Sequence, residues 1–410
     1  MAGMAGCRRG HRRLSPRPPA SVRPASRPLR LAACLPLLGA LAAAPARAQA
    51  PPPQGGEFQI APFNAPVLPS PRRLGQGLSW SGHLDSEAVA VTAGGLRRQP
   101  ASDALLQLGG SLDTGKAGLW PGGKLDFSLM GLATQGNLPA QTGALQTTSN
   151  DWAANFLRVY QLSYRQDLGP GFVRAGIMDV NYDFATVGLA GQLLNASFGP
   201  LPTLTGNAVI ATFPTPGLGL MGGAALGDGY AAQAGVWQAN PPSFSHVASS
   251  GALTLLEGSK GVGTMADGQP RQLFKLGLWH MRQNDPLLGP STGGVYVIAE
   301  TRWNVRTGPR YGAFLQLGAS DGEADPVPRY LGLGLRVERP FAGRPQDSLS
   351  LGLARASLRG QAHAETVLEL GYAYKLAEGL YLQPDVQRIW HAAGDGPAAT
   401  VLTLRAHIEY

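Results

Sequence analysis

Cysteine is almost absent from this chain of 410 residues, and both cysteines, Cys7 and Cys34, lie close to its start. The rest of the sequence therefore has neither a disulfide framework nor a thiolate for catalysis or metal binding. Long apolar runs are missing as well. After residue 48, no segment reaches the roughly 18 consecutive apolar residues that a membrane-spanning helix needs. No repeat of about 20–50 residues is evident, which argues against a propeller or a solenoid.

The formal net charge of +8 belongs to the first 48 residues. That stretch holds nine Arg, no Lys and no acidic residue, and it contains an apolar run at 31–44 and an Ala-Arg-Ala site ending at Ala48. These features predict a signal peptide over residues 1–48, export by the general secretory (Sec-type) route and a mature chain beginning at Gln49. Without the leader, 25 basic residues face 26 acidic ones, so no nucleic-acid partner is expected.

Apolar and polar side chains alternate with a period of two in the last ten residues. Leu402, Leu404, Ala406, Ile408 and Tyr410 are separated by mostly polar residues. A strand with one apolar and one charged face suits a transmembrane β-barrel, with lipid outside and a polar lumen inside. On these residues alone, the last strand of a soluble β-sandwich is the alternative.

Similar alternation recurs along the chain and predicts sixteen strands. They lie near 79–91, 105–112, 124–133, 155–165, 171–178, 217–225, 230–237, 252–262, 271–281, 294–304, 310–318, 329–338, 347–354, 365–376, 380–390 and 399–410. We expect residues 75–410 to form one barrel domain, although two or more soluble β domains are an alternative. The proline-rich residues 49–74 are expected to be a flexible periplasmic arm.

The lengths of the connections provide a second test, because bacterial barrels alternate short periplasmic turns with longer external loops. Tight turns are predicted after even-numbered strands, at 166–170, 226–229, 306–309 and 377–379. Long connections follow odd-numbered strands, at 134–154, 179–216 and 238–251. This parity favours an all-β fold, a 16-stranded antiparallel transmembrane β-barrel of the outer-membrane porin type, over a soluble sandwich.

Motifs that spell catalytic or metal sites lack the required context. Asp179-x-Asn181-x-Asp183 begins like a calcium loop, but Phe184 replaces the turn glycine and Ala190 replaces the bidentate glutamate. A cation site of another kind stays open there. The histidines after the leader show no HExxH spacing. We expect a protein that is not an enzyme and has no cofactor.

Several segments, which follow one another in the same order along the chain, resemble the carbohydrate-selective porin family of the OprB type. They are Trp80–Gly82, Gly176–Ala185, Leu194–Gly199, Glu369–Tyr374 and Leu382–Gln387. One departure is His391-Ala392, where family members often carry His-Pro before the final loop. The resemblance implies a 16-stranded outer-membrane channel that passes sugars such as glucose by facilitated diffusion, without a cofactor.

The expected function is therefore facilitated diffusion of carbohydrates, most of all glucose-like monosaccharides, across the bacterial outer membrane. A general diffusion porin for small hydrophilic solutes is the alternative. A barrel enzyme would need outward-facing Ser and His, whereas the register places His407 inward. Expected partners are sugars in transit, outer-membrane lipid and the barrel-assembly machinery during insertion, with the protein a monomer or a trimer.

The expected substrate path combines an inward-folded loop with inward-facing polar residues. Residues 179–216 form the third external loop, and a connection of this length is usually functional or disordered. We expect it to narrow the pore, as the matching loop does in porins. Arg supplies donors and Asp or Glu accepts from sugar hydroxyls, while an aromatic face can pack on C–H groups. The candidate pore-lining residues are Arg174, Asp183, Trp237, Lys275, Trp279, Glu300, Arg302, Arg336, Glu338, Glu369, Asp385 and Arg405. Inward charges in any barrel also hydrate the lumen or pair across strands, and either Trp could belong to an interfacial girdle.

Overall fold

The computed structural model describes residues 72–73, 76–241, 249–284, 289–304 and 308–409. The predicted leader at 1–48 and most of the predicted arm at 49–74 lie outside these residues, as does Tyr410. From the arm, Arg72–Arg73 form the short strand β1, which pairs with β2 at Ser79 and Trp80.

Sixteen long strands make up the wall within the described residues, and each corresponds to one predicted strand. They are β2 (Leu78–Gly94), β3 (Pro100–Asp113), β4 (Gly123–Gln135), β5 (Phe156–Leu168), β6 (Gly171–Met178), β7 (Gly217–Gly227), β8 (Tyr230–Gln238), β9 (Gly251–Thr264), β10 (Pro270–Gln283), β11 (Thr292–Asn304), β12 (Arg310–Ser320), β13 (Arg329–Glu338), β14 (Ser348–Ser357), β15 (Glu365–Ala377), β16 (Leu380–Trp390) and β17 (Ala399–Glu409).

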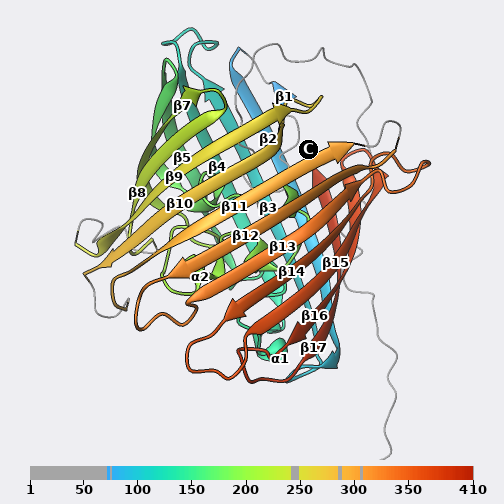
Figure 1. The fold of residues 1–410 in the computed structure, drawn as a ribbon. Helices are drawn as coiled ribbons and strands as arrows, with labels where there is room; N and C mark the ends of the chain where they lie inside the picture. Colours follow the sequence, from blue (N-terminus) through green and yellow to red (C-terminus); the bar gives the residue numbers. More distant parts are fainter. Residues whose placement is uncertain (1–71, 74–75, 242–248, 285–288, 305–307, 410) are drawn as a thin grey trace, which may run out of the picture. The chain divides into compact units, whose positions relative to one another are not determined.

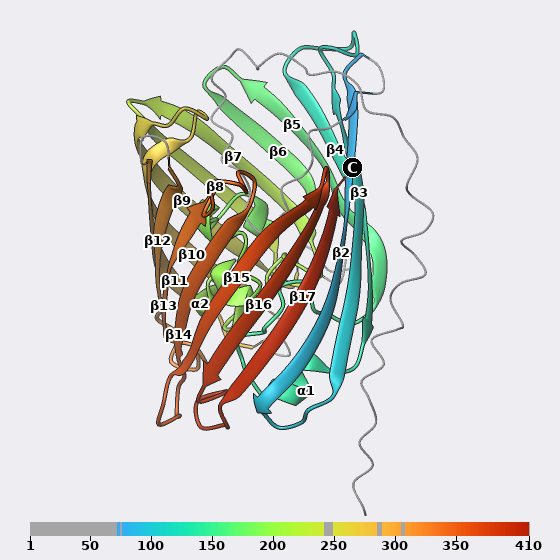
Figure 2. The same ribbon diagram turned by 90° about the vertical axis from the view of Figure 1, so that its right-hand side faces the viewer.

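The sheet closes on itself to form a barrel. Every strand from β2 to β17 pairs antiparallel with its neighbours in sequence, and β17 pairs with β2 from Ala399 opposite Gly94 to Glu409 opposite His83. Figures 1 and 2 show the first and last strands side by side at this seam. Closure pairs the strand edges that an open sheet would expose, which is the arrangement that a lipid environment requires of a β protein.

Side chains alternate between the two faces of the wall, as the sequence period predicts. On β17, Leu402 and Leu404 are exposed on the outer face, whereas Val401, Thr403 and Arg405 are buried on the inner one. The outer face of this strand is therefore apolar, as lipid requires of a transmembrane barrel, and the inner face carries its polar residues together with Val401. The predicted register of the last strand is confirmed over its described residues.

Tight turns join the strands at one end of the barrel. β7 and β8 are linked by Asp228 and Gly229, which have φ values of 49° and 77°. Positive φ at both central residues is the requirement of a two-residue type I′ hairpin. The β5–β6 and β15–β16 turns are equally short, while the β3–β4 and β13–β14 connections at 114–122 and 339–347 are longer than the strict parity predicts.

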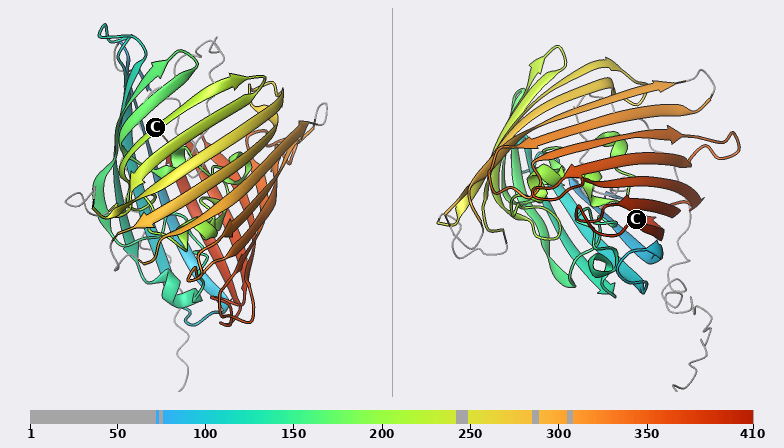
Figure 3. Two further views of the ribbon diagram at one scale, coloured as in Figure 1. Left: turned by 60° about the vertical axis from the view of Figure 1, so that its left-hand side comes forward. Right: turned by 60° about the horizontal axis from the view of Figure 1, so that its bottom comes forward.

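Short helical segments occupy the longer connections, and none of the described helices has the length and apolar character needed to cross a membrane. They are α1 (Leu138–Thr142), η2 (Val180–Tyr182), η3 (Gly188–Ala190), η4 (Ala196–Phe198) and α2 (Pro202–Thr205). In Figure 3, α2 lies within the ring of strands, while α1 lies at the end of the barrel opposite the tight turns in Figure 1.

Candidate functional site

The β6–β7 connection, residues 179–216, packs against the inner face of the barrel wall. Its side chains Phe184, Leu193, Phe198 and Leu201 are buried in the main hydrophobic cluster together with residues of the wall. Its segment α2 contacts β12, and η3 contacts β12 and β13. We call this connection the inward loop.

Two wall glutamates bind pairs of consecutive amides of the inward loop. The N–H groups of residues 188 and 189 donate to the two carboxylate oxygens of Glu300 on β11, at 3.0 and 2.9 Å. Those of residues 194 and 195 donate to the two oxygens of Glu369 on β15. Both carboxylates are buried. These two predicted pore residues therefore bind the loop backbone.

A third set of contacts holds the beginning of the inward loop. The Glu257 carboxylate on β9 accepts from the Ala185 amide at 3.0 Å and from the Tyr296 hydroxyl at 2.7 Å. Lys275 on β10 donates through Nζ to the carbonyl oxygen of Thr186 at 2.9 Å. The predicted residue Lys275 is thus directed at the loop, 4.0 Å from Glu257.

Asp179 ties the start of the inward loop to its far end. Its carboxylate accepts from the amide of Asn181 at 2.7 Å, from the amide of Phe213 at 3.2 Å and from the Tyr160 hydroxyl on β5. Burial raises the pKa of Asp179 to about 6, although these hydrogen bonds favour the charged form. Its oxygens are thus used by the protein, and the described residues contain no group with metal-binding geometry.

A cavity of about 210 Å³ lies between the inward loop and strands β9 to β13. Five of the candidate residues line it: Lys275, Glu300, Arg302, Arg336 and Glu338. We call it the inner cavity. Its lining includes Met265, Asp267 and Gln269 of the turn between β9 and β10, at the tight-turn end of the barrel.

Charges of both signs alternate around the inner cavity. Arg302 donates to Glu300 at 2.9 Å, whereas the Nε of Arg336 lies 3.6 Å from Glu338, beyond hydrogen-bond distance. Arg310 lies 3.4 Å from Asp267 and 3.9 Å from Glu338. A guanidinium has five N–H donors in a planar fork, so these pairs do not use all the donors of the arginines that line the cavity.

A larger cavity, of about 520 Å³, lies on the other side of the inward loop, bordered by the β4–β5 connection and strands β3 to β5. Four aromatic residues, Trp152, Tyr160, Tyr182 and Phe213, line it together with Gln107. We call it the outer cavity. None of the twelve candidate residues belongs to it, although Gln107 and Tyr160 of its lining lie on strands.

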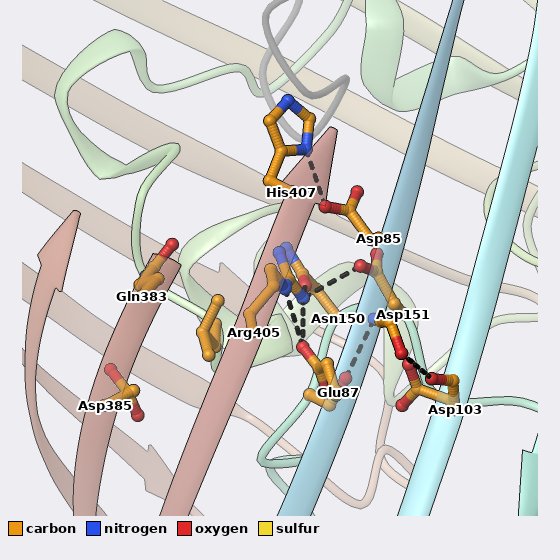
Figure 4. A network of polar contacts seen from close by, with 12 residues as sticks. Asp85, Glu87, Asp103, Asn150, Asp151, Gln383, Asp385, Arg405 and His407 are labelled. Atoms are coloured by element: carbon orange, nitrogen blue, oxygen red, sulfur yellow. Dashed lines mark hydrogen bonds and ion pairs between the residues drawn. The ribbon is translucent and has the colours of Figure 1, made fainter. Parts of the chain in front are cut away.

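A polar network crosses the seam of the barrel, where β17 meets β2 and the β4–β5 connection (Figure 4). Arg405 donates to Glu87 at 2.7 Å and to the side chain of Asn150 at 2.6 Å, and it pairs with Asp151 at 2.8 Å. Burial raises the pKa of Asp151 to about 7, while Arg405 opposes the shift. The candidate residue Arg405 thus links the wall to the connection that borders the outer cavity.

Sequence comparison identifies the family. The profile of the carbohydrate-selective porin, OprB family, matches residues 97–289 and 277–410, well over half of the chain. The chain belongs to this family. No curated protein matches it. Membership and the barrel fold together indicate an outer-membrane channel for carbohydrates.

Solved porin structures share the fold. The high-pH structure of Pseudomonas putida OprB superposes with a TM-score of 0.72 at 17% identity, covering 82% of this chain and 94% of that one. The low-pH structure of the same protein gives 0.56 at 16% identity, with 82% and 93% covered. A mutant of the Rh. blastica porin gives 0.50 at 12% identity, with 81% and 100% covered.

The remaining candidate residues of this OprB-family porin lie elsewhere in the interior. Arg174 pairs with Asp183 of the inward loop at 3.2 Å, where burial raises the pKa of Asp183 against the effect of Arg174. Trp237 packs edge-on against Phe184 with ring centroids 5.6 Å apart. Trp279 is buried in the same hydrophobic cluster.

Asp385 lies on β16 beside the seam (Figure 4) and accepts from Gln387 at 3.2 Å. Reasoning from the sequence missed the inward acids Glu87 and Glu257. The signal was available, because both occupy positions of the same alternation as neighbouring buried residues such as Val89 and Leu255. The sequence could not predict that Glu257 accepts from the amide of Ala185 on the inward loop.

Proposed function

We propose that this porin conducts glucose-like monosaccharides by facilitated diffusion, and that the inner cavity is where it selects them. The observation that carries the proposal is the convergence of Arg302, Arg336 and Glu338 on a small cavity beside the inward loop. A sugar presents hydroxyl groups in all directions, and each hydroxyl both donates and accepts. A wall with alternating guanidinium and carboxylate groups matches that pattern.

Weak binding suits this task. A conducting site must bind the solute well enough to select it and release it quickly enough to pass it on. The pairing of the charges with one another lowers the gain from each sugar contact, because a hydroxyl must compete with an ion pair such as Arg302–Glu300. The proposed route runs from the outer cavity past the inward loop to the inner cavity.

The other candidate residues take indirect roles in this proposal. Trp237 and Trp279 belong to the hydrophobic cluster that also contains the loop side chains, so we assign them to supporting the inward loop. Glu369 and Lys275 bind its backbone. Stacking of a sugar on either Trp stays a prediction, and it would require the loop to expose the ring.

Liposome swelling with a panel of mono- and disaccharides tests the function directly. We expect monosaccharides to enter faster than disaccharides, and glucose to reduce the ion current through single channels. In Arg336→Gln, the glucose concentration for half-block should rise by several-fold to about tenfold, because a charge-assisted hydrogen bond is lost. Arg355→Gln is the matched control, since Arg355 is exposed on β14 and contacts Thr366. Swelling rates that depend on solute size alone, with no current block, would instead indicate a general diffusion porin.

Export and assembly form part of the same proposal. The leader at 1–48 directs Sec-type export, the residues from Gln49 to 74 remain as a periplasmic arm, and the assembly machinery inserts the barrel into outer-membrane lipid as a monomer or a trimer. The basic and apolar pattern of the leader supports the first step.

A further inference from the structure

The inward loop is bound by wall carboxylates in an order that follows the barrel. Along the loop, the amides of residues 185, 188–189 and 194–195 donate to glutamates on β9, β11 and β15 in turn. Loop and wall therefore run in the same direction around the interior from β9 to β15. One strand of the wall supplies one acidic residue at each point of attachment.

The two attachments at Glu300 and Glu369 have the same geometry. In each, both oxygens of one carboxylate accept from two successive backbone N–H groups. These four loop amides do not belong to a strand or a regular helix, so secondary structure supplies no acceptor for them. A buried N–H group needs an acceptor, and here the wall provides it. A carboxyl group presents two oxygens and so meets both amides at once, which a side chain with one acceptor oxygen does not.

Apart from the loop amides, Glu369 interacts with Asp385 on the neighbouring strand β16. Its side chain is fully buried and lines neither the inner nor the outer cavity. Glu300 lines the inner cavity and also accepts from Arg302 at 2.9 Å. The loop, Glu300 and Arg302 are thus linked in one chain of contacts, so a shift of the loop would move a donor of the proposed sugar site.

We propose that Glu300 and Glu369 are positioning residues for conduction: they fix the inward loop at the inner cavity and so set the cross-section through which a sugar passes. This inference rests on the proposed function for its sugar readout alone. The fixing of the loop itself is independent of the solute. Glu369 acts only through the loop, whereas Glu300 also orients Arg302.

Glutamine cannot replace either residue. Its amide has one acceptor oxygen and one NH₂ donor, so the donor would face a backbone N–H. In Glu369→Gln and Glu300→Gln we expect amides 188–195 to exchange hydrogen about tenfold faster or more, measured by mass spectrometry on the folded porin in detergent. Single-channel recordings should show a larger, noisier open current and admission of larger sugars in liposome swelling.

Two controls separate this effect from a change of charge. Glu378→Gln removes the same charge from a turn residue whose side chain is 95% exposed and should leave loop exchange and current unchanged. Glu369→Asp keeps two oxygens on a shorter side chain and should restore part of the protection.

A second pair of variants removes the bond from the loop side and leaves the wall intact. Asn195 has a φ of −65°, the value that a proline ring imposes, and proline lacks the N–H. Asn195→Pro should reproduce the fast exchange and noisy current of Glu369→Gln. Asn195→Ala, which loses the side chain but keeps the amide, should retain more of the protection. The pair tests the proposal even where Glu369→Gln does not assemble, and boiled and unboiled samples on a gel identify folded protein.

The outcomes are distinct. Faster loop exchange and altered current without any sugar dependence would support the positioning role and overturn the proposed function. Unchanged exchange at 188–195 in folded Glu369→Gln and Asn195→Pro would overturn the positioning role and leave the sugar channel standing.

Discussion

At the scale of single residues, Asp347 organises the connection between β13 and β14. Its carboxylate accepts from the guanidinium of Arg344 at 2.8 and 3.0 Å, from the Tyr372 hydroxyl and from the amide of Lys375 at 3.0 Å. Burial works against its charge, but the hydrogen bonds from Arg344 and Tyr372 outweigh burial and hold the pKa of Asp347 below its ordinary value. The charged form therefore stabilises the folded connection.

Asp347→Asn should lower the free energy of unfolding by about 1–3 kcal/mol, because one acceptor of a buried set is lost. A carboxyl whose folded pKa is depressed contributes stability above its unfolded pKa and loses it as pH falls through the folded value. Urea unfolding of both proteins should therefore show a difference near pH 7 that shrinks below about pH 4. Asp167→Asn is the control, since its pair with Arg165 is exposed and contributes little. If the difference in unfolding free energy between the two proteins grew as the pH fell, the predicted direction of the pH dependence would be wrong.

Trp279 tests whether a buried ring supports the inward loop or stacks on sugar. It is 4% exposed on the inner register of β10, while its neighbours Leu276 and Leu278 are exposed outward. In Trp279→Ala, the space left by the removed ring should lower the free energy of unfolding by about 3–5 kcal/mol. The loss should appear as a lower temperature at which the folded gel band disappears. Trp303→Ala, an exposed ring stacked on Tyr311, should cost less. A changed glucose affinity at unchanged stability would favour direct stacking.

At the scale of elements, the base of the inward loop carries its own pH dependence. Asp179 has a pKa of about 6, above the ordinary 3.8, because it is buried. A group of this kind contributes stability below its unfolded pKa and loses it as pH rises through the folded pKa. The loop is therefore expected to tighten on mild acidification, with Asp179 protonated between Tyr160 and the amide of Phe213.

Asp179→Asn should remove this response. From about pH 7 to about pH 5, the wild type should gain stability on the order of 1 kcal/mol, and loop amides should exchange more slowly after correction for intrinsic rates. The variant should show neither change, although it keeps one acceptor oxygen. An equal gain in both proteins would assign the response to another group, for which Asp151, with a pKa of about 7, is the next candidate.

Strands and loops differ in how far the sequence predicts them. Alternation is local, so it identified each of the sixteen strands, although β3 begins at Pro100, before the predicted start at 105. Residues 100–104 are weakly apolar and carry little pattern. The inward loop depends on partners far along the chain: its amides meet Glu300 and Glu369 across 112 and 174 residues. No local pattern encodes such pairs, so candidate pore residues could be placed on the inner face but not assigned their contacts.

At the scale of the whole molecule, the number of strands sets the width of the lumen, and the packing of the inward loop sets how much of it is filled. About sixteen strands enclose a lumen too wide for side chains to fill. The inward loop then fills part of that lumen with buried residues such as Phe184 and Leu201. The closed wall thus provides passage through the membrane, and a loop fixed to its inner face provides the selection proposed above.

The mature porin should begin at Gln49 and fractionate with the outer membrane. A closed barrel has its strand edges paired, so it should resist cold detergent and unfold only on boiling. We expect two gel positions, a fast band without boiling and a slower one after it, and an amino-terminal sequence that starts Gln-Ala-Pro. An unprocessed chain with a heat-dependent shift would disprove the leader assignment alone. Soluble periplasmic protein without a shift would conflict with the outer-membrane barrel, because an outward face carrying Leu402, Leu404 and Leu276 is stable only against lipid or detergent.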